Sequence, residues 1–150
     1  MISIVRILLP TDFSDCSEQA RSYACEFAKR FDAELHLLHV VQPIALPGYI
    51  GPIPQTISEP EEAAKKELDE WQHSSLEDAK NVFRTVKTGA PFVEIVRYAK
   101  EQNIDLIVMG THGRSGFAQA LMGSVAEKVV RKAACPVLTI HPEGHQFVMP

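Results

Sequence analysis

The sequence predicts an α/β protein: a single three-layer domain, residues 1–150, in which a five-stranded, mainly parallel sheet carries helices on both faces. Two observations carry this prediction. Five short runs rich in β-branched and aliphatic residues alternate with four helical patterns, and such alternation is typical of parallel strands joined by right-handed crossover helices. Three of the runs are apolar at almost every position, as strands covered on both faces are.

The strands are predicted from these β-rich runs, which turn signals and helical patterns separate. They cover Ile2–Leu9, Glu34–Val41, Val82–Thr88, Asp105–Met109 and Val137–Ile140. The first, fourth and fifth are the nearly continuous apolar runs, so we expect a sheet that is buried on both sides.

The first two helices are predicted between these strands. Apolar residues recur from Ala20 to Phe31 at the spacing of one helix face. Asp15, followed three residues later by Glu18, indicates a cap at the start of this helix. A second, acidic helix is expected from about Glu59 to Ala79.

Two more helices complete the alternation. Pro91 suits the first turn of the third helix, where its missing N–H costs nothing, and Asn103 can close that helix. The last helix is expected to carry apolar residues from Met122 to Ala133 and to stop before Pro136.

Composition excludes several classes of protein. The hydrophobic content of 45% and charged content of 23% are ordinary for a soluble globular chain. A net charge of −4 argues against nucleic acid as a partner, and no apolar stretch approaches the roughly 18 residues of a membrane span. The apolar N-terminus is too short for a signal peptide. Three cysteines without metal-ligand spacing are expected to be reduced thiols in a cytoplasmic protein.

Two segments depart from regular structure. The connection 42–58 holds four of the ten prolines and two glycines, so it is expected to be a flexible flap; long loops of this kind are commonly functional. The C-terminal tail, 141–150, is expected to fray.

Half of the glycines stand in one connection, GTHGRSGFAQALMGS, between the fourth strand and the last helix. Ligands of open α/β sheets bind at the carboxyl ends of the strands, where the topology reverses. Glycines let free N–H groups approach an anion, and a helix N-terminus favours phosphate. The hydroxyl of Ser124 and the charge of Arg114 can add donors. The stretch therefore predicts polyphosphate binding, mostly by main chain.

Spacing excludes two familiar phosphate motifs. No lysine precedes Ser124, as GxxxxGK[ST] requires. GxGxxG should follow the first strand, where this chain instead has Pro10-Thr11-Asp12. From spacing alone, an ordinary glycine-containing connection remains the alternative.

The motif resembles that of the nucleotide-binding branch of the universal stress protein family. Gly110-x2-Gly113-x9-Gly123-Ser124 matches the branch's G-2x-G-9x-G-[ST] pattern. The match continues in the opening IVRILLPTDFSD, in ELHLLHVV, in DLIVMGTHGRSG and in the closing GSVAEKVVRKAACPVLTI. It covers nearly the whole chain except the 42–58 flap and the second helix.

This resemblance implies a Rossmann-like fold of the adenine-nucleotide alpha-hydrolase kind, with ATP, or ADP or AMP, across the tips of the first and fourth strands. Residues implied to hold phosphates and ribose are Gly110, Gly113, Gly123 and Ser124. Residues implied to line the site are Met109, Thr111, His112, Arg114, Ser115 and Val125. Pro10, Thr11 and Asp12 would border the ribose and the metal, and Val40 would pair with adenine through its main chain.

Asp12 is the candidate metal ligand of the site. A carboxylate at a strand tip suits a ribose hydroxyl or a Mg²⁺ ion shared with phosphates. The alternative is a turn former or helix cap for the following segment.

The histidines give no catalytic assignment. His112 lies beside the expected phosphates, but we interpret it as a loop residue with one hydrogen bond. His36 and His39 are predicted to be packing or surface residues that point to the same or a neighbouring face of the second strand. His141 and His145, in the tail, are weak evidence for a metal site.

The predicted function is that of an ATP-binding universal stress protein, a nucleotide-dependent regulatory or stress-response module that signals to a protein partner. The alternative is a slow Mg²⁺-dependent ATPase or nucleotidyl transferase on the same scaffold. A hydrolase needs a positioned base and a transition-state cation; Arg114 could be the cation, but the sequence offers no convincing base, which favours binding over turnover. A receiver-like phosphoacceptor is disfavoured, because it needs a phosphorylatable Asp at the end of a middle strand and Val82–Thr88 ends without an acid.

The last strand predicts a homodimer. Val137, Leu138 and Ile140 would lie at the sheet edge, and an exposed apolar edge is a pairing hazard unless it is covered. Pairing with a two-fold mate would cover it, and the family resemblance implies such dimers.

Overall fold

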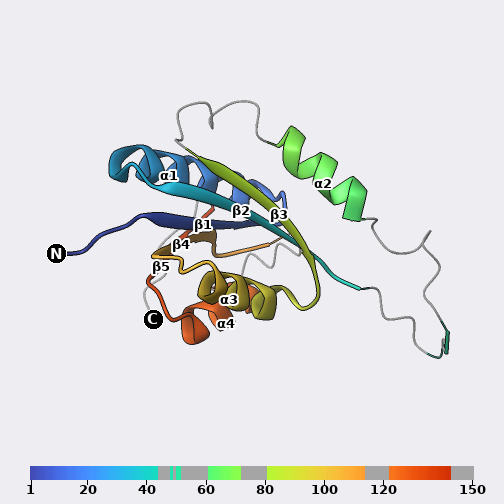
Figure 1. The fold of residues 1–150 in the computed structure, drawn as a ribbon. Helices are drawn as coiled ribbons and strands as arrows, with labels where there is room; N and C mark the ends of the chain where they lie inside the picture. The colour runs from blue at the N-terminus through green and yellow to red at the C-terminus, as the bar shows by residue number, and fades with distance from the viewer. Residues whose placement is uncertain (44–47, 49, 52–60, 72–80, 114–121, 143–150) are drawn as a thin grey trace.

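The computed structural model describes residues 1–43, 48, 50–51, 61–71, 81–113 and 122–142. Within them the elements are β1 (Arg6–Thr11), α1 (Asp15–Phe31), β2 (Glu34–Val41), α2 (Glu61–Glu70), β3 (Val82–Thr88), α3 (Pro91–Glu101), β4 (Leu106–Gly110), α4 (Ser124–Lys132) and β5 (Val137–Ile140). The strands form one sheet in the order β3-β2-β1-β4-β5, with every neighbouring pair parallel (Figure 1). The predicted α/β class is confirmed.

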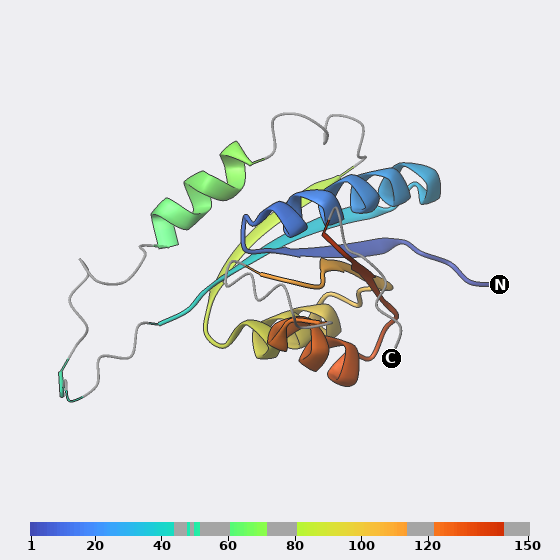
Figure 2. The same ribbon diagram turned by 180° about the vertical axis from the view of Figure 1, so that it is seen from behind.

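The sheet is the middle of three layers. α1 and α2 cover one face and α3 and α4 cover the other, as both views show (Figures 1 and 2). Successive side chains of a strand point to opposite faces of the sheet, and each face has its own core. Leu37 packs with α1 and α2, and Leu38 packs with α3 and α4. This alternation explains why the central strands are apolar at nearly every position.

The first strand is displaced from its predicted bounds of Ile2–Leu9. Pairing with β2 begins only at Arg6, and Ile2 is 92% exposed. The carboxylate of Asp105 accepts hydrogen bonds from the N–H groups of Val5 and Arg6, at 2.8 and 2.9 Å. This bond fixes where the chain enters the sheet, and apolarity alone could not reveal it.

Helix boundaries differ in smaller ways. α1 is capped by Ser14 and not by Asp15, because the Ser14 hydroxyl accepts the N–H of Ser17 while Asp15 stands in the first turn. α4 begins at Ser124 with Gly123 as its N-cap, which agrees with a helix start predicted near Gly123-Ser124, and Met122 precedes it. α2 is described only over Glu61–Glu70, so most of the rest of the predicted Glu59–Ala79 helix lies outside the described residues, as do most of the 42–58 flap and the tail.

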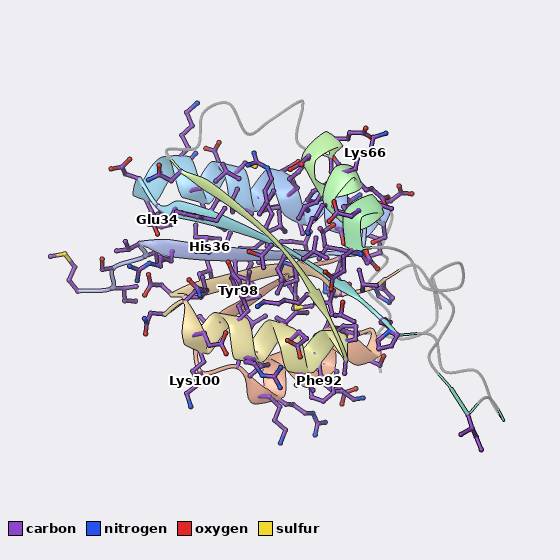
Figure 3. The ribbon with its side chains drawn as sticks, turned by 45° about the vertical axis from the view of Figure 1, so that its right-hand side comes forward. Glu34, His36, Lys66, Phe92, Tyr98 and Lys100 are labelled. Carbon is purple, nitrogen blue, oxygen red and sulfur yellow. The ribbon has the colours of Figure 1, made fainter. Side chains whose placement is uncertain are left out.

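His36 and His39 lie on opposite faces of β2, so the prediction that they point to the same or a neighbouring face is wrong. Side chains alternate along a strand, and a separation of three residues reverses the side. The packing prediction holds for both, which are 4% and 5% exposed. Figure 3 shows His36 and Tyr98 on the α3 side of the sheet, where His36 Nδ1 lies 2.9 Å from the Tyr98 hydroxyl.

The three cysteines are free thiols, as expected. Burial raises the pKa of Cys25 to about 11, and burial also raises the pKa of Cys135. Both thiols are therefore protonated at neutral pH. Among the described residues, no helix is long and apolar enough to cross a bilayer.

The buried His36 makes stability depend on pH. Burial lowers its pKa; the Glu34 carboxylate opposes this shift and Arg6 adds to it, while Thr85 and Phe83 of β3 bring no charge. Since the folded pKa lies below the unfolded value of about 6.5, the folded state binds fewer protons. We therefore expect stability to be full above pH 6.5 and to fall as the pH drops below it.

This expectation is tested with His36→Leu, which removes the titrating ring. Its urea midpoint should change less than that of the wild type between about pH 7.5 and about pH 5, although the loss of the Tyr98 bond costs about 1 kcal/mol at the higher pH. An equal pH dependence in both proteins would contradict the assignment to His36.

Candidate functional site

A cavity of about 500 Å³ opens at the carboxyl ends of β1 and β4. The chain proceeds from β1 to β2 and β3 on one side, then returns to build β4 and β5 on the other, so the strand order reverses here. Pairing of β1 with β4 ends at Leu8. Asp105 N donates to the carbonyl of Arg6. In a parallel sheet the peptide groups of every second residue point to the same neighbouring strand, so the backbone of Pro10, like that of Arg6, points toward β4. Because proline offers no N–H, the two strands separate at this point.

Most residues predicted for the site line this cavity. They are Pro10, Thr11, Asp12, Val40, Met109, Gly110, Thr111, His112, Gly113, Gly123, Ser124 and Val125. Arg114 and Ser115 lie outside the described residues. The cavity is therefore lined by predicted residues from four separate parts of the sequence.

The cavity also has lining residues that the sequence argument missed. They are Ser17, Leu38, His39, Gln42, Pro91, Ile95 and Ala126. Pro91 had a usable signal, since it follows the carboxyl end of a predicted strand. Ile95 and Leu38 had none, because their apolar periodicity is that of core residues.

Asp12 is fixed by the turn that leads into α1. Its Oδ1 accepts the Ser14 N–H at 3.0 Å and the Ser17 hydroxyl at 2.8 Å. The next residue, Phe13, has φ of 62°, a conformation uncommon for a bulky side chain. The turn-forming interpretation of Asp12 is thus correct, and one carboxylate oxygen is committed to it.

The other oxygen of Asp12 lies against the glycine loop. A Cβ atom built on Gly113 would come within 2.6 Å of Asp12 Oδ2. The Asp12 carboxylate, in the loop after β1, therefore lies against the backbone of Gly113, in the loop after β4. A side chain at Gly113 would displace this carboxylate.

The other two motif glycines are required by backbone packing. A Cβ on Gly110 would lie 2.7 Å from Cys16 Sγ and 3.1 Å from the Cys16 carbonyl, and one on Gly123 would lie 2.8 Å from the Thr111 carbonyl. The Gly123 N–H donates to that carbonyl at 2.5 Å. The Gly123 contacts hold the start of α4 against the end of β4, and the Gly110 contacts bring α1 close to β4.

The N-terminus of α4 faces the cavity, and no side chain of the described residues caps it. Gly123 is its N-cap and has no side chain, and Gly123–Ala126 lines the cavity. The first N–H groups of a helix have no intrahelical acceptor, and the helix dipole places partial positive charge there. This end of the cavity can accept an anion.

The β2 side of the cavity offers apolar contacts and one exposed peptide edge. Leu38 of β2 and Ile95 of α3 supply apolar lining there, next to the polar side chains of His39 and Gln42, while Met109 of β4 adds apolar lining next to the glycine loop. In β2, Glu34 N donates toward β1 and the Val41 carbonyl accepts from β3, so by alternation the peptide groups of Val40 face the β1 side. Pairing of β1 and β2 ends at Thr11 and His39, which leaves the Val40 carbonyl beyond the end of β1.

His112 takes part in a short polar chain. Its Nδ1 lies 2.8 Å from the Thr111 hydroxyl, which also lies 3.4 Å from His141 Nδ1. The interpretation of His112 as a hydrogen-bonded loop residue agrees with this contact. The described residues hold no cluster of three or more His, Cys, Asp or Glu side chains that could bind a metal.

The fold and the cavity together define a class: an open, parallel α/β domain whose strand-order reversal carries a glycine loop and a helix N-terminus. The sequence profile of the Universal stress protein family matches residues 4–141. The chain belongs to the universal stress protein family.

Known proteins agree with this membership. Universal stress protein MJ0531 of Methanocaldococcus jannaschii is 38% identical over 144 residues, which cover 90% of this chain and 81% of that protein. The structure of UspA from Lactobacillus plantarum superposes with a TM-score of 0.74 at 29% identity, covering 92% and 98% of the two chains. A universal stress protein solved in complex with cAMP has a TM-score of 0.69 at 25% identity, covering 94% and 99%.

The glycine contacts predict a difference in stability. Gly110→Ala should lower the free energy of unfolding by about 1–3 kcal/mol, because the new methyl group meets the buried Cys16 sulfur at 2.7 Å and the Cys16 backbone at 3.1 Å, and α1 fixes both. Gly113→Ala should cost less, since it meets only the end of the Asp12 side chain. Urea unfolding of both variants measures this difference, and equal losses would show that the Asp12 carboxylate is as rigid as the backbone.

Proposed function

We propose that this chain binds an adenine nucleotide in the cavity and acts as a nucleotide-dependent regulatory or stress-response module in the cytoplasm. The observation that carries the proposal is that one cavity combines the glycine loop and the N-terminus of α4 on the β4 side with the apolar residues Leu38 and Ile95 on the β2 side. A nucleotide likewise combines anionic phosphates with a flat, largely apolar base. The relative solved with cAMP supports an adenine nucleotide as the ligand.

The phosphates would lie at the α4 end. The free N–H groups after Gly123 and the hydroxyl of Ser124 are the donors, and backbone donors near Gly113 would add to them. Arg114 and Ser115 remain proposed phosphate contacts from the loop.

The base would lie at the β2 end. The Val40 carbonyl, past the end of β1, can accept from the exocyclic amino group of adenine. Guanine carries a carbonyl in place of this amino group. The guanine carbonyl and the Val40 carbonyl would then face each other as two acceptors without a donor, which costs binding free energy. The cavity therefore favours adenine.

Mg²⁺ fits the phosphate end. Mg²⁺ is usually bound by one or two carboxylates together with substrate phosphates and water. Asp12 meets this requirement, because its Oδ2 lies toward the glycine loop while its Oδ1 is held by Ser14 and Ser17. When bound, the ion would neutralise phosphate charge.

We also propose that two copies pair through β5. Thr111 N and Ile107 N donate to carbonyls of Ile140 and Pro136, so the even-numbered residues of β5 face β4. Thr139 therefore turns its peptide groups to the outer edge of the sheet. The outer edge of β5 has no strand beside it among the described residues, and a two-fold copy would satisfy these groups.

Nucleotide binding is tested by titrating the protein with ADP or ATP and magnesium in a calorimeter. We expect saturable binding by the wild type, weaker binding of GDP, and loss of binding in Gly113→Val, whose side chain would occupy the phosphate space and push Asp12 aside. Thermal unfolding of Gly113→Val is the control for folding. Unchanged affinity in a folded Gly113→Val protein would contradict the site.

The dimer is tested by sedimentation at micromolar concentration. The wild type should have about twice the 16.7 kDa mass of one chain. Thr139→Pro should be monomeric, because it removes an N–H from the outer edge and leaves the bonds to β4 intact. Thr139→Val, which keeps the N–H, is the matched control. A wild type found only as a monomer would exclude the dimer.

A further inference from the structure

We propose that His39 is a positioning residue of the nucleotide site, which holds the Thr11–Phe13 turn and thereby the Asp12 carboxylate in place. This inference rests on the proposed function. His39 is 5% exposed and lines the cavity from the end of β2. It stands opposite Thr11 in the pairing of β1 and β2, directly before the turn.

Two contacts join the His39 ring to this turn. Its Nδ1 lies 2.8 Å from the carbonyl of Thr11, and because a carbonyl only accepts, Nδ1 carries the proton and donates. The ring also packs against Phe13, with centroids 4.5 Å apart and the ring planes tilted by 32°. Asp12 lies between the two residues that His39 contacts, so the ring fixes both ends of a three-residue turn.

The turn needs such support. Phe13 holds a positive φ, which costs free energy for a bulky residue and persists only where its surroundings impose it. The Phe13 ring also meets Trp71 edge-on, with centroids 5.9 Å apart. His39 and Trp71 therefore both pack against the Phe13 ring, which helps to keep the turn in its unusual conformation.

The second ring nitrogen of His39, Nε2, indicates that the histidine does more than stabilise the folded protein. With the proton on Nδ1, Nε2 carries a lone pair, yet this buried atom has no hydrogen-bond partner in the described structure. A buried acceptor without a donor is a net cost. An aliphatic side chain would avoid that cost but would leave the Thr11 carbonyl without its donor.

His36 provides a matched control on the same strand. It is equally buried, has one hydrogen bond through Nδ1 and one stacked ring, and also has no hydrogen-bond partner at Nε2 among the described residues. It contacts Tyr98 of α3, however, and does not line the cavity. The two histidines thus differ in what their Nδ1 contacts, and His36 also has a Glu34 carboxylate oxygen 3.7 Å from its Nε2.

The test compares the affinity for ADP and magnesium of His39→Leu, His39→Asn and His36→Leu by calorimetry. We expect His39→Leu to weaken binding about tenfold, the effect of about 1.4 kcal/mol. His39→Asn should stay within about threefold of the wild type, because an asparagine amide N–H can take the place of Nδ1–H. His36→Leu should bind like the wild type.

A double-mutant cycle tests whether His39 acts through Asp12. In an Asp12→Asn background, His39→Leu should cause little further loss of affinity, since residues that act through one another are not additive. If His39→Leu does not fold, His39→Gln replaces it, because the longer amide reaches the position of Nε2 and not that of Nδ1.

Four results would overturn the inference alone: unchanged affinity in His39→Leu, equal losses in His39→Asn and His39→Leu (or His39→Gln), an equal loss in His36→Leu, or additive effects in the cycle. A wild type that binds no nucleotide would overturn the proposed function and this inference together.

Discussion

The site depends on the pairing of β1 with β2 on one side and with β4 on the other. These pairings have different lengths: β1 stays paired with β2 as far as Thr11, but with β4 only as far as Leu8. The strands therefore separate at the reversal of strand order, and Pro10 prevents them from closing. Both loops that border the cavity begin at this point, so the register of β1 fixes the distance between Asp12 and the glycine loop.

Much of the fold could be predicted because its signals are local. The bounds of β2, β3 and β5 follow from short β-rich runs, and Pro91 stands in the first turn of α3, as predicted. The start of β1 could not be predicted because it depends on the carboxylate of Asp105, about a hundred residues away. Local patterns do not report such a bond.

The candidate site divides in the same way. Its glycine loop and strand tips were visible as motifs, because main-chain binding of an anion requires small residues at fixed spacing. Its apolar lining on the β2 side was not visible, because Ile95 and Leu38 look like core residues until the topology places them beside the cavity. Gly110 shows a further limit: the family resemblance implied a phosphate contact, and the motif could not reveal that a Cβ there would also strike Cys16.

Burial alone does not separate structural from functional residues in this chain. The carboxylate of Asp12 illustrates the reason, since its Oδ1 forms a turn with Ser14 and Ser17 while its Oδ2 faces the glycine loop. The turn is therefore part of the site, and whatever holds the turn also shapes the site. On β2, two residues of equal burial lie on opposite faces, and only one contacts that turn. A buried polar group is best interpreted by following its hydrogen bond to the backbone it fixes, and then asking whether that backbone carries an atom facing the cavity.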